Sequence, residues 1–417
     1  MFFMNRSDFK KKTFTHIPVY SGDVSGAASA LYEMGGMTVI HDPSGCNSTY
    51  NTHDELRWEK KESLIYISGL RESDAIRGND SRLINDTLSA LSSLKQRPSF
   101  IAVCNSPVPD IIGTDFSAIT RLIELRSGIR TFYVPTNAMH DYTTGAANAF
   151  LALAKVFLTS ERLSAARSGK SVNLLGLTPF EFPYESQIDC LYSLLEDAGL
   201  TVASNWGRGS SSHSAGSIEK AVLADVSLVV SSTGILAADY LYRNYGIPYV
   251  IGDPVFSTSP SASLDLFQRK TIDSLYAAME SGSCENVYMD ILGVSQWKIR
   301  NEASPVTAFI GEPVMMGSAA ASFSLSHPGK KVRLIAATET KGHGLISSEV
   351  ISPCGEAEIA DAISDCSTIL GDPLLKNAAH GSKRGFCSDK QRWIDMPHLA
   401  MSGRMFIASP KAFIPQM

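Results

Sequence analysis

The chain is organised around the stretch MTVIHDPSGCNSTYNTHDE, residues 37–55. Its first four residues, Met37–Ile40, are the apolar run of a short buried strand, and the loop that follows carries Cys46. The arrangement recurs in FIAVCNSPVPDIIGTDF, residues 100–116, where a second strand pattern ends on Cys104. We therefore expect two cysteines at or just past the carboxyl ends of two strands of one α/β sheet, the edge at which such sheets bind ligands.

These two cysteines have the surroundings expected of metal or iron–sulfur ligands, although two thiolates are too few to complete such a site. The chain has seven cysteines, an odd number, and no export signal is visible, which argues against a disulfide framework. Cys190 and Cys366 fall inside helical patterns, where a small buried thiol is the simpler interpretation. The other three have no Cys or His at ligand spacing: Cys284, Cys354 and Cys387.

Strand and helix patterns alternate along the chain, which is typical of doubly wound parallel sheets. The strands expected in the first third are 37–40, 64–70, 100–103 and 131–135. The alternation begins again near residues 171 and 305, so we predict three α/β units of the same topology without an obvious sequence repeat. Two segments are expected to be irregular, a tight turn at 21–26 and a glycine- and serine-rich loop at 204–216.

The composition is that of a globular protein and argues against nucleic-acid binding and against a membrane span. Hydrophobic residues make up 44% of the chain and charged residues 19%, which is ordinary for a globular protein with a large core. The formal net charge is −5, and no basic tract stands out, so nucleic acid is not expected as a partner. The amino terminus has no apolar core of a signal peptide, and no apolar run reaches about 18 residues, so we expect a cytoplasmic protein that does not span a membrane.

Several segments resemble the nitrogenase component 1 superfamily, which includes nitrogenase molybdenum–iron protein subunits, protochlorophyllide reductase and nickel-sirohydrochlorin reductive cyclase. The similar segments are GAASALYEMGGMTVIHDPSGC, SGLRESDAIRGN, AVCNSPVPDIIGTD, VVSSTGILAADYLYRNYGIPYV and WIDMPHLAMSGRMF. The most specific mark is Gly113 with Asp115 beside Cys104. The resemblance implies three Rossmann-like domains, each a parallel sheet flanked by helices, which we place at 1–165, 166–304 and 305–417.

The resemblance also implies a dimer with an iron–sulfur cluster at the subunit interface, and Cys46 and Cys104 match two of the family's cluster ligands. The second landmark usually carries a further cysteine, but the matching position here is Ile65 or Tyr66. A four-iron cluster commonly takes four thiolates, and a twofold axis brings the same patch together twice. We therefore expect a homodimer with one bridging [4Fe–4S] cluster; a heterodimer with a related chain and a larger cluster are the alternatives.

A nitrogenase-type catalytic cofactor is not expected, and whether another metallocofactor is bound stays open. In the molybdenum–iron protein one cysteine and one histidine hold the catalytic cofactor; the cysteine matches Val230 or Ser231 here, so that thiol is absent. The histidine matches His398, for which the expected roles are a metal ligand, a contact to an anionic substrate or a proton donor. The alternative is a histidine that caps the backbone of a buried loop.

Other residues are candidates for the walls of the site. His41 and Asp42 precede the cluster loop, which also carries Gly45, and are expected either to tune the cluster or to form a turn. In the 204–216 loop, Trp206, Arg208 and His213 suit a ligand-binding wall, and a plain solvent loop is the alternative. Lys341 and His343 follow a strand and are expected to face the cleft between domains.

The predicted function is that of a nitrogenase-like oxidoreductase component. A separate ATP-hydrolysing iron–sulfur reductase would pass electrons to the interface cluster, and a small-molecule substrate would be reduced between the domains. The chain has no Walker motif, so nucleotide chemistry is expected on that partner. The alternatives are a scaffold on which a metallocofactor is assembled and a metal-free α/β binding protein.

Overall fold

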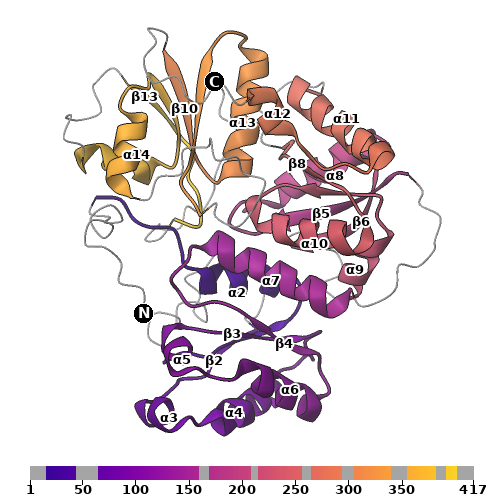
Figure 1. Ribbon diagram of the computed structural model, residues 1–417, viewed down its shortest axis with the longest axis vertical. Helices are drawn as coiled ribbons and strands as arrows, with labels where there is room; N and C mark the ends of the chain where they lie inside the picture. The colour runs from indigo at the N-terminus through magenta and orange to yellow at the C-terminus, as the bar shows by residue number, and fades with distance from the viewer. Residues whose placement is uncertain are drawn as a thin grey trace.

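The computed structural model describes eight stretches of the chain: residues 16–43, 64–158, 169–207, 215–255, 264–293, 305–339, 355–381 and 391–401. Their strands form three sheets in which every pairing is parallel, with helices on the faces (Figure 1). This confirms the predicted α/β fold of three Rossmann-like units. The exact domain boundaries stay predictions.

The first sheet has the strand order β2-β1-β3-β4. Its strands are β1 (Met37–Ile40), β2 (Ile65–Ile67), β3 (Ile101–Cys104) and β4 (Thr131–Val134). Its helices are α2 (Asp23–Glu33), α3 (Glu72–Arg77), α4 (Asp80–Ser92), α5 (Pro107–Ile112) and α6 (Phe116–Ser127). Alternate residues of β3 face opposite ways, so Ile101 and Val103 pack with α4 and α6 while Ala102 and Cys104 pack with α2.

The second sheet has the order β6-β5-β7-β8-β9. Its strands are β5 (Ser171–Leu177), β6 (Thr201–Gly207), β7 (Val226–Val229), β8 (Tyr249–Ile251) and β9 (Glu285–Asn286). The accompanying helices are α8 (Glu185–Asp197), α9 (Ala215–Glu219), η3 (Lys220–Leu223), η4 (Ser232–Gly234), α10 (Ile235–Tyr245), α11 (Leu266–Ser281) and α12 (Val287–Leu292). The central strands β5, β7 and β8 are almost entirely buried, as both faces of a covered parallel sheet require, and the buried Asn173 and Ser227 side chains are hydrogen-bonded to each other.

The third sheet has the order β11-β10-β12-β13. Its strands are β10 (Val306–Gly311), β11 (Lys331–Ala336), β12 (Thr368–Gly371) and β13 (Arg392–Asp395). Its helices are α13 (Pro313–Ser326), α14 (Glu356–Ile363) and η5 (Pro373–Gly381). Ala308 and Ile310 of the central strand pack with α14, while Phe309 between them belongs to the core cluster that includes α13, so helices cover both faces.

Helix α7 (Tyr142–Phe157) joins the first two sheets and crosses α2 closely between them (Figure 1). A Cβ atom on Gly26 would lie 1.9 Å from the Tyr142 carbonyl oxygen, and one on Gly145 would lie 1.8 Å from the Asp23 carbonyl oxygen. The two backbones can approach so closely only because glycine stands at both positions. One buried apolar cluster runs continuously through this crossing into all three sheets.

When the strands of each sheet are numbered along the chain, they lie side by side in the order 2-1-3-4, and the second sheet adds a fifth strand after the fourth. The chain therefore leaves the first strand toward one edge of the sheet and leaves the third strand toward the other edge. Such a reversal leaves a crevice at the carboxyl ends of those two strands, where open α/β sheets bind ligands. In this protein those positions are the carboxyl ends of β1 and β3, of β5 and β7, and of β10 and β12.

Some local predictions were wrong. The 21–26 segment is not a tight turn throughout, because α2 begins at Asp23. The loop predicted at 204–216 is strand up to Gly207, since β6 continues through the Trp206 position. Helices α5 and α12 and strand β13 were missed, α5 because its two prolines resemble loop signals although Pro at the first turn favours a helix. In the described ranges, no helix is long and apolar enough to cross a membrane.

Candidate functional site

Cys104 is the last residue of β3, at the carboxyl edge of the first sheet, and its side chain is fully buried against the face that α2 covers. Loss of hydration raises the pKa of the Cys104 thiol, the nearby Asp23 carboxylate acts in the same direction, and a hydrogen bond with the Thr136 hydroxyl opposes both. The neutral thiol is therefore favoured, and a cation at the sulfur would be needed to hold the thiolate. Cys46 and Gly45 lie outside the described residues, so the pairing of the two cysteines stays a prediction.

His41 lies beside Cys104, because it follows the neighbouring strand, and Asp42 next to it is hydrogen-bonded to Ser68. The His41 amide donates to the Cys104 carbonyl oxygen at 3.0 Å, and His41 Nδ1 lies 2.8 Å from Ser68 Oγ. Burial lowers the pKa of His41 to about 4, although the carboxylates of Asp42 and Asp74 oppose the shift. The His41 side chain is consequently neutral near pH 7 and can act as a hydrogen-bond partner but not as a fixed positive charge.

A second group of polar side chains lies where the three sheets meet. Tyr142 begins α7, Glu181 follows β5, Glu312 follows β10, and His398 follows β13. All four side chains are buried, although two of them are carboxylic acids. We call these four residues the central cluster.

The two acids of the central cluster are held by hydrogen bonds from neutral donors. Glu312 Oε1 accepts from the Ser232 amide at 2.8 Å and its Oε2 accepts from the Met315 amide at 2.8 Å, so it caps α13 and ties it to the second sheet. Glu181 Oε2 accepts from the Thr178 hydroxyl, whereas its Oε1 has no hydrogen-bond partner among the described residues. Burial raises the pKa of both acids, and for Glu181 the charge of Glu312 adds to the shift.

His398 is fixed on both sides of its ring. Its amide donates to Asp372 Oδ2 at 2.6 Å, its Nδ1 accepts from the Ala400 amide at 3.2 Å, and its Nε2 lies 3.5 Å from the Tyr142 hydroxyl oxygen. Burial lowers the pKa of His398 to about 4. The Tyr20 and Tyr142 rings pack against the imidazole, with centroids 5.6 and 5.7 Å from its own.

Of the remaining predicted site residues, Trp206 is the one that the structure describes, and it joins neither group. Trp206 is fully buried in β6 and its ring nitrogen donates to Ser204 Oγ at 3.1 Å, so it packs in the core of the second sheet instead of lining a loop. Arg208, His213, Lys341 and His343 lie outside the described residues. Ser231 Oγ donates to the Gly176 carbonyl oxygen at 2.7 Å.

Sequence reasoning missed Glu181, Glu312 and Tyr142. A signal was available for the two acids, because each is a lone Glu close behind a buried apolar strand, in GLTPFEF and FIGEP.

Within the described ranges, no group of three or more His, Cys, Asp or Glu side chains is arranged to hold a metal ion. Cys104 is therefore the one predicted cluster ligand among the described residues. A Cys thiolate is the usual ligand of an iron–sulfur cluster, so Cys104 fits such a site but does not complete it.

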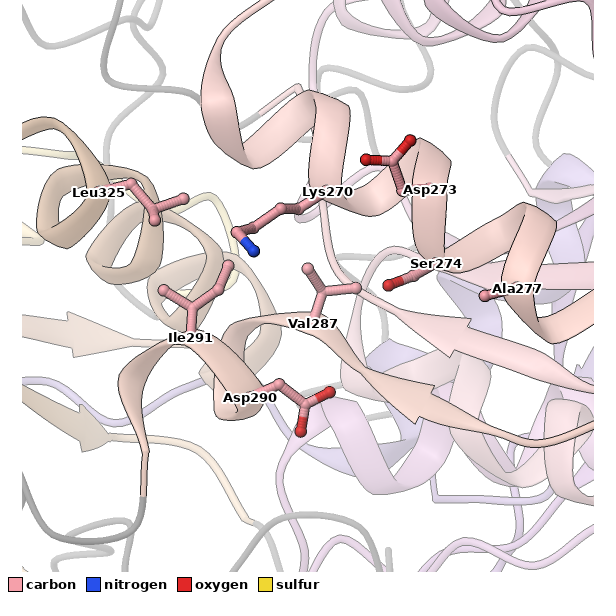
Figure 2. Close-up of a pocket in the computed structure, with 8 residues that line it drawn as sticks. All are labelled: Lys270, Asp273, Ser274, Ala277, Val287, Asp290, Ile291 and Leu325. Atoms are coloured by element: carbon pink, nitrogen blue, oxygen red, sulfur yellow. The ribbon is translucent and has the colours of Figure 1, made fainter.

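Figure 2 shows a surface depression between α11, α12 and α13, away from the residues discussed above. The residues that line it are Lys270, Asp273, Ser274, Ala277, Val287, Asp290, Ile291 and Leu325. Lys270 and Asp273 come from α11 and Asp290 from α12 opposite, and none of the predicted site residues lines the depression.

Comparison with known proteins agrees with this architecture. The solved structure titled "Nitrogenase Cp1 at pH 6.5" superposes with a TM-score of 0.62 and 15% sequence identity, over 94% of this chain and 88% of that chain. "Nitrogenase Cp1 at pH 5" gives a TM-score of 0.50 and 17% identity, over 81% and 68%. These two similarities establish the fold.

Residues 23–259, more than half of the chain, match the family described as nitrogenase component 1 type oxidoreductase. The chain therefore belongs to the nitrogenase component 1 type oxidoreductases.

Proposed function

We propose that this protein is the catalytic component of a nitrogenase-like oxidoreductase, which receives electrons from an ATP-hydrolysing iron–sulfur reductase and reduces a small molecule between its three sheets. Cys104 carries the proposal, because it stands at the carboxyl end of β3, at the crevice of the first sheet. Members of this family generally bind iron–sulfur clusters, work with an ATP-dependent reductase and form oligomers.

The proposed cluster ligands are Cys46 and Cys104 of two identical subunits. One chain supplies two thiolates, and a twofold axis through the site supplies the four that a [4Fe–4S] cluster takes. When bound, the cluster supplies one-electron redox chemistry. The chain itself would provide a dry, apolar surrounding for Cys104 and neutral hydrogen-bonding groups, His41 and Ser68, beside it.

The proposed docking surface for the reductase is an exposed apolar patch near Cys104, formed by Ile76 of α3 and by Ile111 and Ile112 of α5. These side chains are 77%, 83% and 41% exposed, and the two helices contact each other. Exposed isoleucines grouped in this way are typical of a protein-binding site. Because α5 begins three residues after Cys104, a reductase bound to this patch would lie close to the proposed cluster, where electrons would enter.

Iron content and visible absorption of anaerobically purified protein test the cluster. We expect iron in the wild-type protein and its loss in Cys46→Ala and in Cys104→Ala, because each removes two of the four ligands of a symmetric dimer. Cys190→Ala is the matched control, since Cys190 is exposed on α8 and should leave the iron content unchanged. Iron retained after both Cys46 and Cys104 are replaced contradicts the proposal.

Electron transfer is tested separately, with the loaded protein and a reduced reductase of the iron-protein type. ATP-dependent bleaching of the cluster absorption supports a catalytic component. If the cluster instead passes to an apo-acceptor protein without being reduced, the chain is an assembly scaffold and the proposed activity is wrong.

A further inference from the structure

One pair of side chains joins the first and third sheets at their carboxyl edges. His140 lies in the turn between β4 and α7, and Glu339 follows the carboxyl end of β11. His140 Nδ1 lies 3.0 Å from Glu339 Oε2, and the two side chains are 49% and 40% exposed. The pair is therefore fixed at the junction of two sheets and is still in contact with solvent.

Glu339 is held against the first turn of α7. Its Oε2 accepts a hydrogen bond from the Thr144 hydroxyl at 2.9 Å, and its amide donates to Asp141 Oδ2 at 2.5 Å. Asp141 itself caps α7, because it accepts from the Thr143 amide at 3.0 Å. The carboxylate beside His140 thus has a defined position relative to this helix.

The two nitrogens of the His140 ring have different surroundings. An ionised carboxylate can only accept hydrogen bonds, so Nδ1 must donate to Glu339. Among the described residues, Nε2 has no hydrogen-bond partner. A histidine that a carboxylate orients through one nitrogen, with the other nitrogen free, has the arrangement of a general acid or base.

The turn that carries His140 is held by a buried carboxylate. Asp23 is 1% exposed and accepts hydrogen bonds from the amides of Asn137 and Ala138 at 2.9 and 2.7 Å. Its own amide donates to the His140 carbonyl oxygen at 3.0 Å. Ala138 has a positive φ of 58°, and strained residues of this kind cluster at functional sites. The turn therefore fixes the backbone from which the imidazole projects.

The same turn belongs to the sheet edge that carries Cys104. Strands β3 and β4 are neighbours, with Cys104 opposite Val134, and the turn to His140 follows Val134 directly. The charge of Asp23 acts on the Cys104 thiol, and the charge of His140 acts on Asp23. His140 thus stands at the edge where an α/β sheet binds its ligand, together with the proposed cluster ligand.

We propose that His140 is the proton donor of this site, and that Glu339 is a positioning residue that holds the ring by Nδ1. This inference rests on the proposed function, in which the reductase supplies electrons to a bound substrate. Each electron adds one negative charge to the substrate. The N–H bond at Nε2 of the imidazolium then breaks, and its proton forms a bond to the reduced atom. The neutral ring keeps its Nδ1 proton on Glu339, and solvent returns a proton to Nε2.

The charged groups on the elements that meet at this imidazole are all acids. They are Glu339 after β11, Asp141 at the start of α7 and Asp23 at the start of α2. Proton transfer should be fastest where the ring is protonated and should slow as rising pH removes that proton. This pH dependence should be absent in His140→Gln, because an amide does not titrate.

The state of the ring is measured by nitrogen NMR of histidine-labelled full-length protein, with His140→Gln identifying the resonances. For the neutral ring, at alkaline pH, we expect the proton on Nδ1 and a free lone pair on Nε2. Acidification should then add a proton at Nε2. A neutral ring that carries its proton on Nε2 overturns the assignment.

Two variants of Glu339 separate positioning from simple structural support. Glu339→Gln keeps a side-chain oxygen that can accept from Nδ1, whereas Glu339→Leu has a similar size and no acceptor. We expect the neutral ring to keep its Nδ1 proton in Glu339→Gln and to lose this preference in Glu339→Leu. Identical His140 resonances in the two variants contradict the positioning role.

Proton transfer itself is measured with the loaded protein, the reductase and ATP, without an added substrate. Solvent protons are then the acceptor, and the probe is hydrogen, formed from two electrons and two protons. His140→Gln should lower kcat for hydrogen release by about 100-fold, the usual contribution of a general acid. His16→Gln is the control, because His16 is an exposed histidine outside this site. Hydrogen release by His140→Gln at the wild-type rate, or bleaching of the wild-type cluster without hydrogen, refutes the proposal.

Cluster bleaching distinguishes failure of this inference from failure of the proposed function. His140→Gln should be bleached as fast as the wild type, because electron entry precedes proton transfer. If both proteins are bleached and release hydrogen equally fast, this inference fails and the proposed function stands. If the wild type is not bleached, the proposed function fails and His140 loses its role as donor, while NMR still decides whether Glu339 orients the ring.

Discussion

Three buried ionisable residues keep their neutral forms because burial removes the water that would hydrate their charged forms. Cys104, His41 and His398 all have pKa values displaced away from the charged form, with loss of hydration as the largest cause.

The first prediction concerns the pH dependence of stability through His398. In the unfolded chain the ring takes up a proton near pH 6.5, whereas in the folded protein it does so only near pH 4. The contribution of His398 to the free energy of unfolding is therefore complete above pH 6.5 and declines as the pH falls toward 4, by about 1.4 kcal/mol per pH unit. Urea unfolding of the wild type and His398→Gln at several pH values measures it. Parallel curves across this window contradict the prediction.

A second residue-scale prediction concerns Ala138, the one described residue other than glycine with a positive φ, 58°. The conformation is held by Asp23, whose side chain accepts hydrogen bonds from the amides of Asn137 and Ala138 at 2.9 and 2.7 Å. Replacing Ala138 with Gly relieves the strain but makes the unfolded chain more flexible, so we expect a net gain of about 0.5 kcal/mol in the free energy of unfolding.

Thermal or urea unfolding measures the effect of Ala138→Gly. The control is Ala277→Gly, at an exposed position in the middle of α11, which should lower the free energy of unfolding by about 1 kcal/mol. A loss of stability at Ala138 similar to that at Ala277 would show that the positive φ is not strained.

Among the elements, the crossing of α2 and α7 is the most constrained contact. A methyl group at Gly145 would lie 1.8 Å from a backbone oxygen of α2, and the backbone cannot move aside as a flexible side chain would. We expect Gly145→Ala and Gly26→Ala each to lower the free energy of unfolding by about 1–3 kcal/mol, the usual cost of overpacking. Chemical unfolding followed by circular dichroism provides the measurement.

The matched control for this crossing is Gly252→Ala. A Cβ atom there would find its nearest neighbour, Phe267 Cζ, at the ordinary contact distance of 3.5 Å, so stability should stay equal or rise slightly. If Gly252→Ala and Gly145→Ala destabilise the protein equally, the close approach of the helices is not the cause.

For the whole molecule, the patch formed by Ile76, Ile111 and Ile112 predicts where the reductase binds. Ile111→Asp should weaken binding of the reductase at least tenfold, because a charge replaces an apolar side chain at the centre of the contact. Its Tm should be unchanged, since the residue is 83% exposed. Binding measured by interferometry, with Leu125→Asp on α6 as the equally exposed control, tests this. Equal binding by both variants would place the contact elsewhere.

The chain's distant segments are joined by hydrogen bonds to the same junction. Ser21 donates its amide to the Ala400 carbonyl oxygen at 2.7 Å, and the Tyr142 amide donates to the Ser21 carbonyl oxygen at 2.7 Å. Glu312 links the third sheet to Ser232 of the second. These links bring Tyr20, Tyr142 and His398 into contact.

The sequence by itself determined most strands and helices, because the signals for them are local. Apolar runs such as Met37–Ile40, and helical spacing such as that in Phe116–Leu125, depend on neighbours a few residues away. The same local signals located Cys104 at a strand end and His41 directly after the neighbouring strand. They failed at Trp206, because the glycine- and serine-rich composition of this segment predicts a loop. In the structure its first residues are the end of strand β6, which pairs with β5.

Only the tertiary structure decided the composition of the centre. Glu181 and Glu312 are single polar residues in apolar surroundings, and nothing near either of them in sequence indicates that they lie close to Tyr142 and, through it, to His398. Burial is the largest cause of their pKa displacements, and Glu312 takes a hydrogen bond from Ser232, which lies 80 positions away in the sequence. Local sequence specifies which segments become strands, whereas the charge state of a buried group depends on everything packed around it.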